Sequence, residues 1–208
     1  MGAPTIYHHK GDLPNDITFP NGVAIDTEAM GLNPHRDRLC VVQLSGGDHT
    51  AHVVQLNEDT RFDCPNLKSV LADDDLEKIY HYGRFDIAVI YQYLGILTRN
   101  VFCTKIASKL VRTFISRHGL KALCSDLLSI ELSKQSQTSD WGASDLSKEQ
   151  LAYAASDVLY LHQLKEKLSV LLEREKRWDL AKGCFEALPT VARLDLLGYE
   201  DLSIFTHN

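Results

Sequence analysis

The sequence predicts one α/β domain, with strands in the first half of the chain and helices in the second. Short β-branched runs dominate up to residue 82, and helical spacing of apolar residues dominates from residue 85 onward. The chain has 208 residues, of which 44% are hydrophobic and 24% charged, an ordinary globular mix. We therefore expect a single domain over residues 1–208.

Four short apolar or alternating segments predict the strands. The expected strands are Val23–Glu28, Leu39–Leu44, His49–Leu56 and Ile79–Tyr82. The turn Gly46-Gly47-Asp48 lies between the second and third segments. We therefore expect these two strands to form a hairpin.

Apolar residues at helical spacing predict the helices. The expected helices are Phe85–Tyr93, Thr104–Phe114, Leu120–Leu128, Ser147 to about Arg174, and about Arg177 to Leu188. Ser147 and Gln150 predict a capping box at the start of the fourth helix, which is the clearest in the chain. Pro189 is expected to break the last helix.

The composition predicts a cytoplasmic protein without a membrane span. No apolar run approaches the ~20 residues that a spanning helix needs, and the first ten residues contain no signal-peptide core. The five cysteines are odd in number and show no C-x-x-C spacing. Free thiols in a reducing compartment are therefore expected, without a disulfide framework or a thiolate zinc site.

The charge pattern favours a short anionic partner over a long one. A net charge of −6 is unusual for a protein that binds long nucleic acid through its phosphates. Between Asp86 and Asp126, however, all charged residues are basic: Arg99, Lys105, Lys109, Arg112, Arg117 and Lys121. They predict either a local basic patch or an ordinary solvated helix face.

Asp26 and Glu28 are two positions apart on an expected strand, so their side chains lie on the same face. Two adjacent carboxylates repel each other, and a cation between them would relieve the repulsion. Oxygen ligands suit Mg²⁺ or Mn²⁺. The alternative is a strand end with two solvated acids.

Asp86 and Asp157 occupy helical settings. Asp86 begins a helix, where the helix dipole alone favours an acid. Asp157 lies four residues after Tyr153, on the same helix face and beside an apolar stripe. A buried acid needs a partner, which a metal ion or a hydrogen-bond network would supply.

Three segments resemble the motifs of the DEDD superfamily of 3′-5′ exonucleases. Val23–Glu28 resembles the first motif, and His81–Asp86 resembles the second as found in ribonuclease D. Leu151–Val158 resembles the third motif of the subgroup that carries a tyrosine, here Tyr153. The resemblance covers about residues 5–175 and leaves a helical tail after it.

The resemblance implies a ribonuclease H-like fold, with a mixed central sheet flanked by helices. It implies that Asp26, Glu28, Asp86 and Asp157 hold two divalent ions, Mg²⁺ or Mn²⁺. It also implies that Tyr153 positions the attacking water, with a share in deprotonating that water as the further role. Two such ions stabilise the attacking and leaving oxygens of phosphoryl transfer. The product would be a nucleoside 5′-monophosphate.

Further residues near the motifs are expected to bind substrate. These are Thr27, Met30, Gly31, Leu32, His81, Arg84, Lys109 and Arg112. We expect Leu32 to act as a wedge against a base, with simple packing as the alternative. For Arg84 the alternative is a structural ion pair. Trp141 would either stack on a base or anchor the core.

The short length, the acidic charge and the segment Asp26–Leu32 resemble the bacterial nano-RNase C group. That resemblance implies degradation of very short RNA, notably dinucleotides, by a homo-oligomeric ring for which an octamer is one expectation. Two alternatives are ribonuclease D-like trimming of longer RNA and a DNA exonuclease. A non-catalytic nucleic-acid-binding domain is least favoured, because all four carboxylates and Tyr153 are present.

Overall fold

A mixed six-stranded sheet forms the centre of the computed structural model, which describes residues 2–56, 62–132, 139–199, 204–205 and 207. Its order is β1-β4-β3-β2-β5-β6. The strands are β1 (Thr5–Lys10), β2 (Val23–Ala29), β3 (Leu39–Ser45), β4 (Thr50–Gln55), β5 (Lys78–Tyr80) and β6 (Val101–Cys103). β3 pairs antiparallel with both β2 and β4. The other three pairs, β1 with β4, β2 with β5 and β5 with β6, are parallel.

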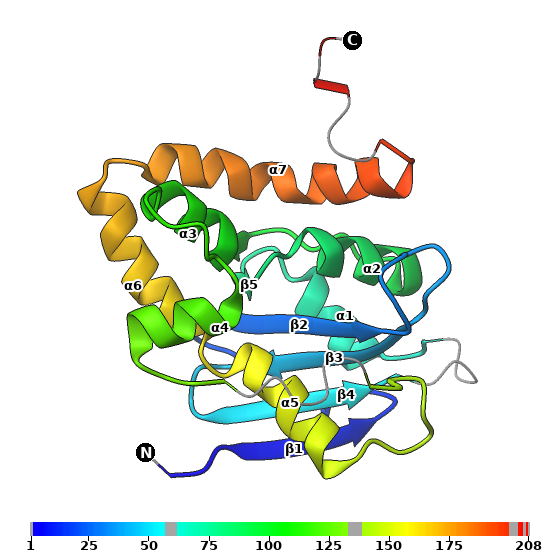
Figure 1. Ribbon diagram of the computed structural model, residues 1–208. Helices are drawn as coiled ribbons and strands as arrows, with labels where there is room; N and C mark the ends of the chain where they lie inside the picture. Colours follow the sequence, from blue (N-terminus) through cyan, green and yellow to red (C-terminus); the bar gives the residue numbers. More distant parts are fainter. Residues whose placement is uncertain (1, 57–61, 133–138, 200–203, 206, 208) are drawn as a thin grey trace.

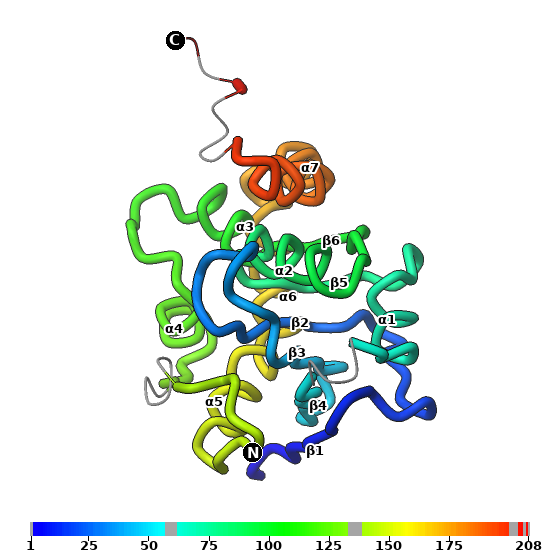
Figure 2. Tube along the Cα trace, turned by 90° about the vertical axis from the view of Figure 1, so that its right-hand side faces the viewer, coloured from blue at the N-terminus to red at the C-terminus, as the bar shows by residue number. Residues whose placement is uncertain are grey.

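Helices cover this sheet on both sides (Figures 1 and 2). They are α1 (Pro65–Ala72), α2 (Arg84–Leu94), α3 (Thr104–Val111), α4 (Leu120–Leu123), α5 (Lys148–Val158), α6 (Leu161–Arg174) and α7 (Trp178–Leu196), with a π-helical turn, η2 (Cys124–Leu128), after α4. α5 packs across β1 to β4, and α1 lies on the opposite side of the sheet. α7 packs along α2 and α3. The mixed sheet flanked by helices that the sequence predicted is confirmed.

Two predicted local signals, the turn between β3 and β4 and the capping box at the start of α5, are confirmed. β3 and β4 form the expected hairpin, and Gly47 in its turn has φ +79°, a value that glycine adopts without strain. Ser147 and Gln150 form the capping box that begins α5. α2 ends at Gly95, which has φ +73°.

The expected single helix from Ser147 to Arg174 is wrong, because the chain turns at Leu159 and Tyr160 between α5 and α6. No proline or glycine marks this turn. α5 packs on β1 to β4, whereas α6 packs on α3 and β5. The two helices follow different surfaces of the molecule, so tertiary packing sets the turn.

The predicted break at Pro189 is also wrong, since this residue lies inside α7. A proline in a helix interior costs roughly 3 kcal/mol. Here Pro189 is buried, together with Phe185, Leu188 and Ala192 of the same helix. Burial of this apolar stripe offsets the lost hydrogen bond.

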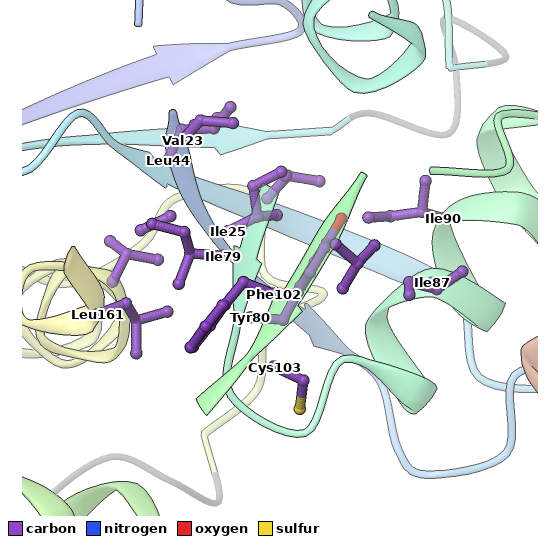
Figure 3. Packing of buried hydrophobic residues seen from close by; sticks show 14 of the residues in the cluster. Val23, Ile25, Leu44, Ile79, Tyr80, Ile87, Ile90, Phe102, Cys103 and Leu161 are labelled. Atoms are coloured by element: carbon purple, nitrogen blue, oxygen red, sulfur yellow. The ribbon is translucent and has the colours of Figure 1, made fainter. Parts of the chain in front are cut away.

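Two buried clusters hold the layers together. In the main core, Ile87 and Ile90 of α2 lie on one side of Tyr80 and Phe102, and Leu161 of α6 lies on the other (Figure 3). A smaller cluster lies under the first half of α5; its buried members are Cys40, Val41, Val53, Trp141 and Ala154. All five cysteines are free thiols, as predicted. No helix in the described part of the chain is long and apolar enough to cross a membrane.

Candidate active site

Three carboxylates meet where α5 crosses β2. Asp26 and Glu28 project from β2, and Asp157 projects from the last turn of α5. One oxygen of each carboxylate lies within 4.8 Å of the others. The apolar residues Val23 and Ile25 of β2 are fully buried and fix the strand from which the first two acids project.

Asp86 supplies a fourth carboxylate from the first turn of α2, and only 5% of this residue is exposed. Its Oδ1 accepts a hydrogen bond from the hydroxyl of Thr27 at 2.6 Å. The negative charge of Asp86 also acts on Asp26, Glu28 and Asp157, whose pKa values it raises. The fold therefore brings together all four acids of the three motifs.

The electrostatics of this cluster favour a cation. Burial raises the pKa of Glu28 to about 9, and that of Asp86 and of Asp157 to about 7. Burial also raises the pKa of Asp26 well above its usual range, and repulsion by Asp86, Asp157 and Glu28 adds to this. Because like charges are crowded in a partly buried site, divalent cations with oxygen ligands fit these residues.

Tyr153 lies one helical turn before Asp157, so the two side chains share a face of α5. Burial, and then the nearby charges of Asp157, Glu28 and Asp26, raise the pKa of the Tyr153 phenol above its usual range. Its ring packs against Trp141, with the ring centroids 6.1 Å apart. Trp141 is only 4% exposed, so the structure favours its role as an anchor over stacking on a base.

The loop after β2 presents apolar side chains at the mouth of the site. Leu32 is 87% exposed and Met30 is 59% exposed. Asp37 organises this loop by accepting hydrogen bonds from the Asn33 amide and from Arg36. A side chain at Gly31 would meet Asp37, because a Cβ atom there would lie 2.2 Å from its Oδ2.

These groups line one open cleft with a volume of about 1100 Å³. The cleft contains the four acids and Tyr153, and six of the expected substrate-binding residues: Thr27, Met30, Gly31, Leu32, His81 and Arg84. Lys109 and Arg112 do not line it. Arg112 is 4% exposed and forms an ion pair with Asp126. Its guanidinium therefore neutralises this carboxylate and does not face the cleft.

Three cleft residues have partners that the sequence did not reveal. The Thr27 hydroxyl orients Asp86. His81 shares a hydrogen bond with Thr104, and burial, followed by the charge of Lys105, lowers its pKa to about 3, so the imidazole is neutral at pH 7. Arg84 forms an ion pair with Asp195 of α7, which is the alternative considered for it.

Sequence reasoning missed two further cleft residues. Asp195 is 111 positions from Arg84, and no local pattern connects them. Tyr82 has φ +69°, unusual for a residue other than glycine, and the ammonium of Lys105 lies 4.0 Å from the centroid of its ring. Its position inside the segment His81–Asp86 was the available signal.

Sequence comparisons place these motifs in a known family. The family described as 3′-5′ exonuclease matches residues 14–173. Ribonuclease D of Gluconacetobacter diazotrophicus is 34% identical over 157 residues, which cover 76% of this chain and 39% of that protein. DNA polymerase I of Aquifex aeolicus is 37% identical over 148 residues, 71% of this chain and 24% of that protein. The chain thus spans well under half the length of these curated relatives.

Structure comparisons give matches over nearly the whole chain. Brucella melitensis NrnC bound to pGG is 54% identical, with a TM-score of 0.94 and coverage of 99% of this chain and 100% of that one. NrnC with bound Mg²⁺ is 53% identical, with a TM-score of 0.92 and coverage of 98% and 100%. Escherichia coli RNase D shares the fold at 24% identity and a TM-score of 0.71, over 83% of this chain and 45% of that one. The ribonuclease H-like fold expected from the motifs is the fold of these nucleases.

Proposed function

Because the chain belongs to the 3′-5′ exonuclease family of the ribonuclease D and NrnC type, we propose that it is a metal-dependent 3′-5′ exoribonuclease for very short RNA, with dinucleotides as preferred substrates. The observation that carries this proposal is the meeting of four carboxylates and Tyr153 in one open cleft.

Asp26, Glu28, Asp86 and Asp157 would hold two divalent cations, for which Mg²⁺ is the first choice. NrnC with bound Mg²⁺ is a close structural relative. When bound, such ions offset the negative charge that gathers at phosphorus and make a water more acidic. Without them, the four acids would repel a phosphodiester.

Tyr153 would orient the attacking water toward the last phosphodiester bond. Hydrolysis of that bond would release a nucleoside 5′-monophosphate. Its raised pKa means that the phenol keeps its proton at neutral pH in the metal-free site. In the metal-free site it is therefore a hydrogen-bonding group rather than a base. Its packing on Trp141 restricts the directions in which the hydroxyl points.

The preference for dinucleotides is supported by three observations. The ligand of the NrnC structure, pGG, is a dinucleotide by its formula. In this chain, the exposed Leu32 stands at the mouth of the cleft, where it could separate the bases of a short substrate. The net charge of −6 also disfavours long RNA, which binds through many phosphates.

Two other substrates remain as candidates. Ribonuclease D-like trimming of longer RNA is supported by the ribonuclease D relatives, and DNA hydrolysis by the DNA polymerase I relative. A length series separates them. It would use 5′-labelled RNA of two nucleotides and longer, matched DNA strands, and Mg²⁺ or Mn²⁺.

We expect rapid cleavage of the RNA dinucleotide and slower cleavage of longer strands. The control is Asp157→Asn, which removes one ligand and should be inactive at every length. Equal or faster trimming of long RNA would replace the short-RNA proposal with general trimming. Faster cleavage of DNA would favour the DNA exonuclease, and no metal-dependent cleavage would overturn the enzyme proposal.

We also propose that the chain forms a homo-oligomer, with an octamer as the expected form. Leu197 and Phe205 near the C-terminus are 69% and 75% exposed, as apolar residues of a subunit contact would be in a single chain. Light scattering of the purified protein would give its mass in solution. A monomer at micromolar concentration would contradict this proposal.

A further inference from the structure

An ion pair ties the C-terminal helix to the wall of the cleft. Arg84 Nε donates to Asp195 Oδ2 at 2.6 Å, and Arg84 Nη2 donates to Asp195 Oδ1 at 2.5 Å. The two side chains are 25% and 18% exposed. A bidentate arginine–carboxylate pair fixes the plane of the guanidinium as well as its position.

This pair joins a residue inside the region that matches the family to a residue outside it. Arg84 begins α2, two residues before Asp86, within the family match of residues 14–173. Asp195 lies near the end of α7, outside that match. Yet Asp195 and Gly198 line the same cleft as the four acids. The end of α7 and the residues after it thus add a wall that the matched region does not contain.

We propose that Asp195 is a positioning residue, which holds the Arg84 guanidinium in the cleft wall so that it binds a phosphate of the substrate. The proposal rests on the proposed nuclease function. Arg84 is a cation in a cleft that is otherwise strongly acidic, so its placement matters for an anionic substrate. A side chain that is already ordered loses less entropy when the substrate binds.

The opposite role would be a latch, in which Asp195 competes with the substrate phosphate for Arg84. The two roles predict opposite results for Asp195→Asn, which keeps the shape of the side chain and removes its charge. A positioning residue requires the Michaelis constant, KM, to rise. A latch requires KM to fall, because Arg84 would be released to the phosphate.

The test measures kcat and KM for an RNA dinucleotide with Mg²⁺. We expect Asp195→Asn to raise KM about tenfold, as for loss of one charged hydrogen bond, with kcat nearly unchanged. Asp195→Glu should restore much of the binding. Addition of Asp195→Asn to Arg84→Ala should have little further effect, because the residue that Asp195 positions is then gone.

The matched control is Glu77→Gln. Glu77 pairs with Lys165 of α6 at a similar burial, and neither residue lines the cleft. Loss of the Glu77–Lys165 ion pair should lower the melting temperature about as much as Asp195→Asn does and leave KM unchanged. Equal rises of KM in both variants would assign Asp195 a purely structural role.

Binding gives a readout that does not need turnover. In an Asp157→Asn background, fluorescence anisotropy with a labelled dinucleotide should show weaker binding when Asp195→Asn is added. An unchanged or lower KM in an active enzyme overturns the positioning role alone. An inactive wild-type protein would instead contradict the proposed function.

Discussion

At the scale of single residues, Thr27 has a role that its position in the first motif does not show. Its hydroxyl donates to Asp86, so it acts on a metal-ligand candidate from the strand that carries Asp26 and Glu28. Residues that orient ligands in this way commonly contribute as much to a metal site as a weak ligand does.

Thr27→Val keeps the shape of the side chain and removes the hydrogen bond to Asp86. We expect Mg²⁺ affinity or activity to fall roughly 10–100-fold, the usual range for loss of such a partner. Mg²⁺ titration of the initial rate would measure it. Ser45→Ala is the control, because it removes a buried hydrogen bond to the Thr50 carbonyl away from the acids. Unchanged Mg²⁺ dependence in Thr27→Val would contradict the orienting role.

Tyr153→Phe removes the hydroxyl beside Asp157 and leaves the ring on Trp141. We expect kcat to fall about 100-fold, within the range for loss of a group that handles the attacking water. KM and Mg²⁺ dependence should change little. A parallel loss of Mg²⁺ binding would mean that Tyr153 mainly supports Asp157.

The residues that the sequence could place were those in dense local motifs. Asp26 and Glu28 share a strand face by simple periodicity, and Tyr153 and Asp157 share a helix face. Roles that depend on distant partners were not predictable. Arg112 was expected on a phosphate, but Asp126 pairs with it in the interior. Arg84 required Asp195, 111 residues away.

At the scale of elements, the loop after β2 depends on a glycine for its shape. Gly31→Ala would place a Cβ atom against Asp37 Oδ2, which hydrogen bonds already hold in place. The loop must shift, and Leu32 shifts with it. We expect kcat/KM for dinucleotides to fall by up to about 100-fold, the cost of misplacing a contact by about 1 Å.

A glycine in an open setting gives the control for this loop. Gly183→Ala lies in α7, where a Cβ atom meets no other group within 4 Å. It should leave kcat/KM unchanged. If Gly31→Ala is also fully active on dinucleotides, the loop does not position Leu32 for the substrate.

The sequence predicted which helices and strands form better than where they begin and end. The apolar strands and the capped start of α5 were visible because propensity, pattern and capping agree there. β1 was missed because His8, His9 and Lys10 give this edge strand a polar sequence. The turn between α5 and α6 was missed because only packing on different surfaces causes it.

At the scale of the whole molecule, the acid cluster couples stability to pH. Folded-state pKa values of about 7 for Asp86 and Asp157, and about 9 for Glu28, lie above the ordinary value near ~4 for unfolded carboxyls. Between these limits the folded protein binds more protons than the unfolded chain. The metal-free protein should therefore lose stability as pH rises through 7 and on to 9.

Melting temperatures in a chelator between pH 5.5 and 9 would measure this loss. Added Mg²⁺ should raise the melting temperature more at pH 8 than at pH 5.5, because protons compete for the same oxygens. Asp157→Asn should flatten the chelated profile. A wild-type melting temperature that rises with pH in chelator would contradict the assignment.

Tyr153 and Asp157, on the same helix α5, lie against two different buried clusters. Tyr153 packs on the small cluster with Trp141 and Ala154, whereas Ala155 and Val158 beside Asp157 belong to the main core. A small cluster opens at lower free energy than a large one. Amide hydrogen exchange should therefore be faster in the first half of α5 than in α6. A brief opening there would displace the Tyr153 hydroxyl from the attacking water while the metal ligands stay in place. Mild warming should therefore abolish activity at a lower temperature than the one at which Mg²⁺ is released.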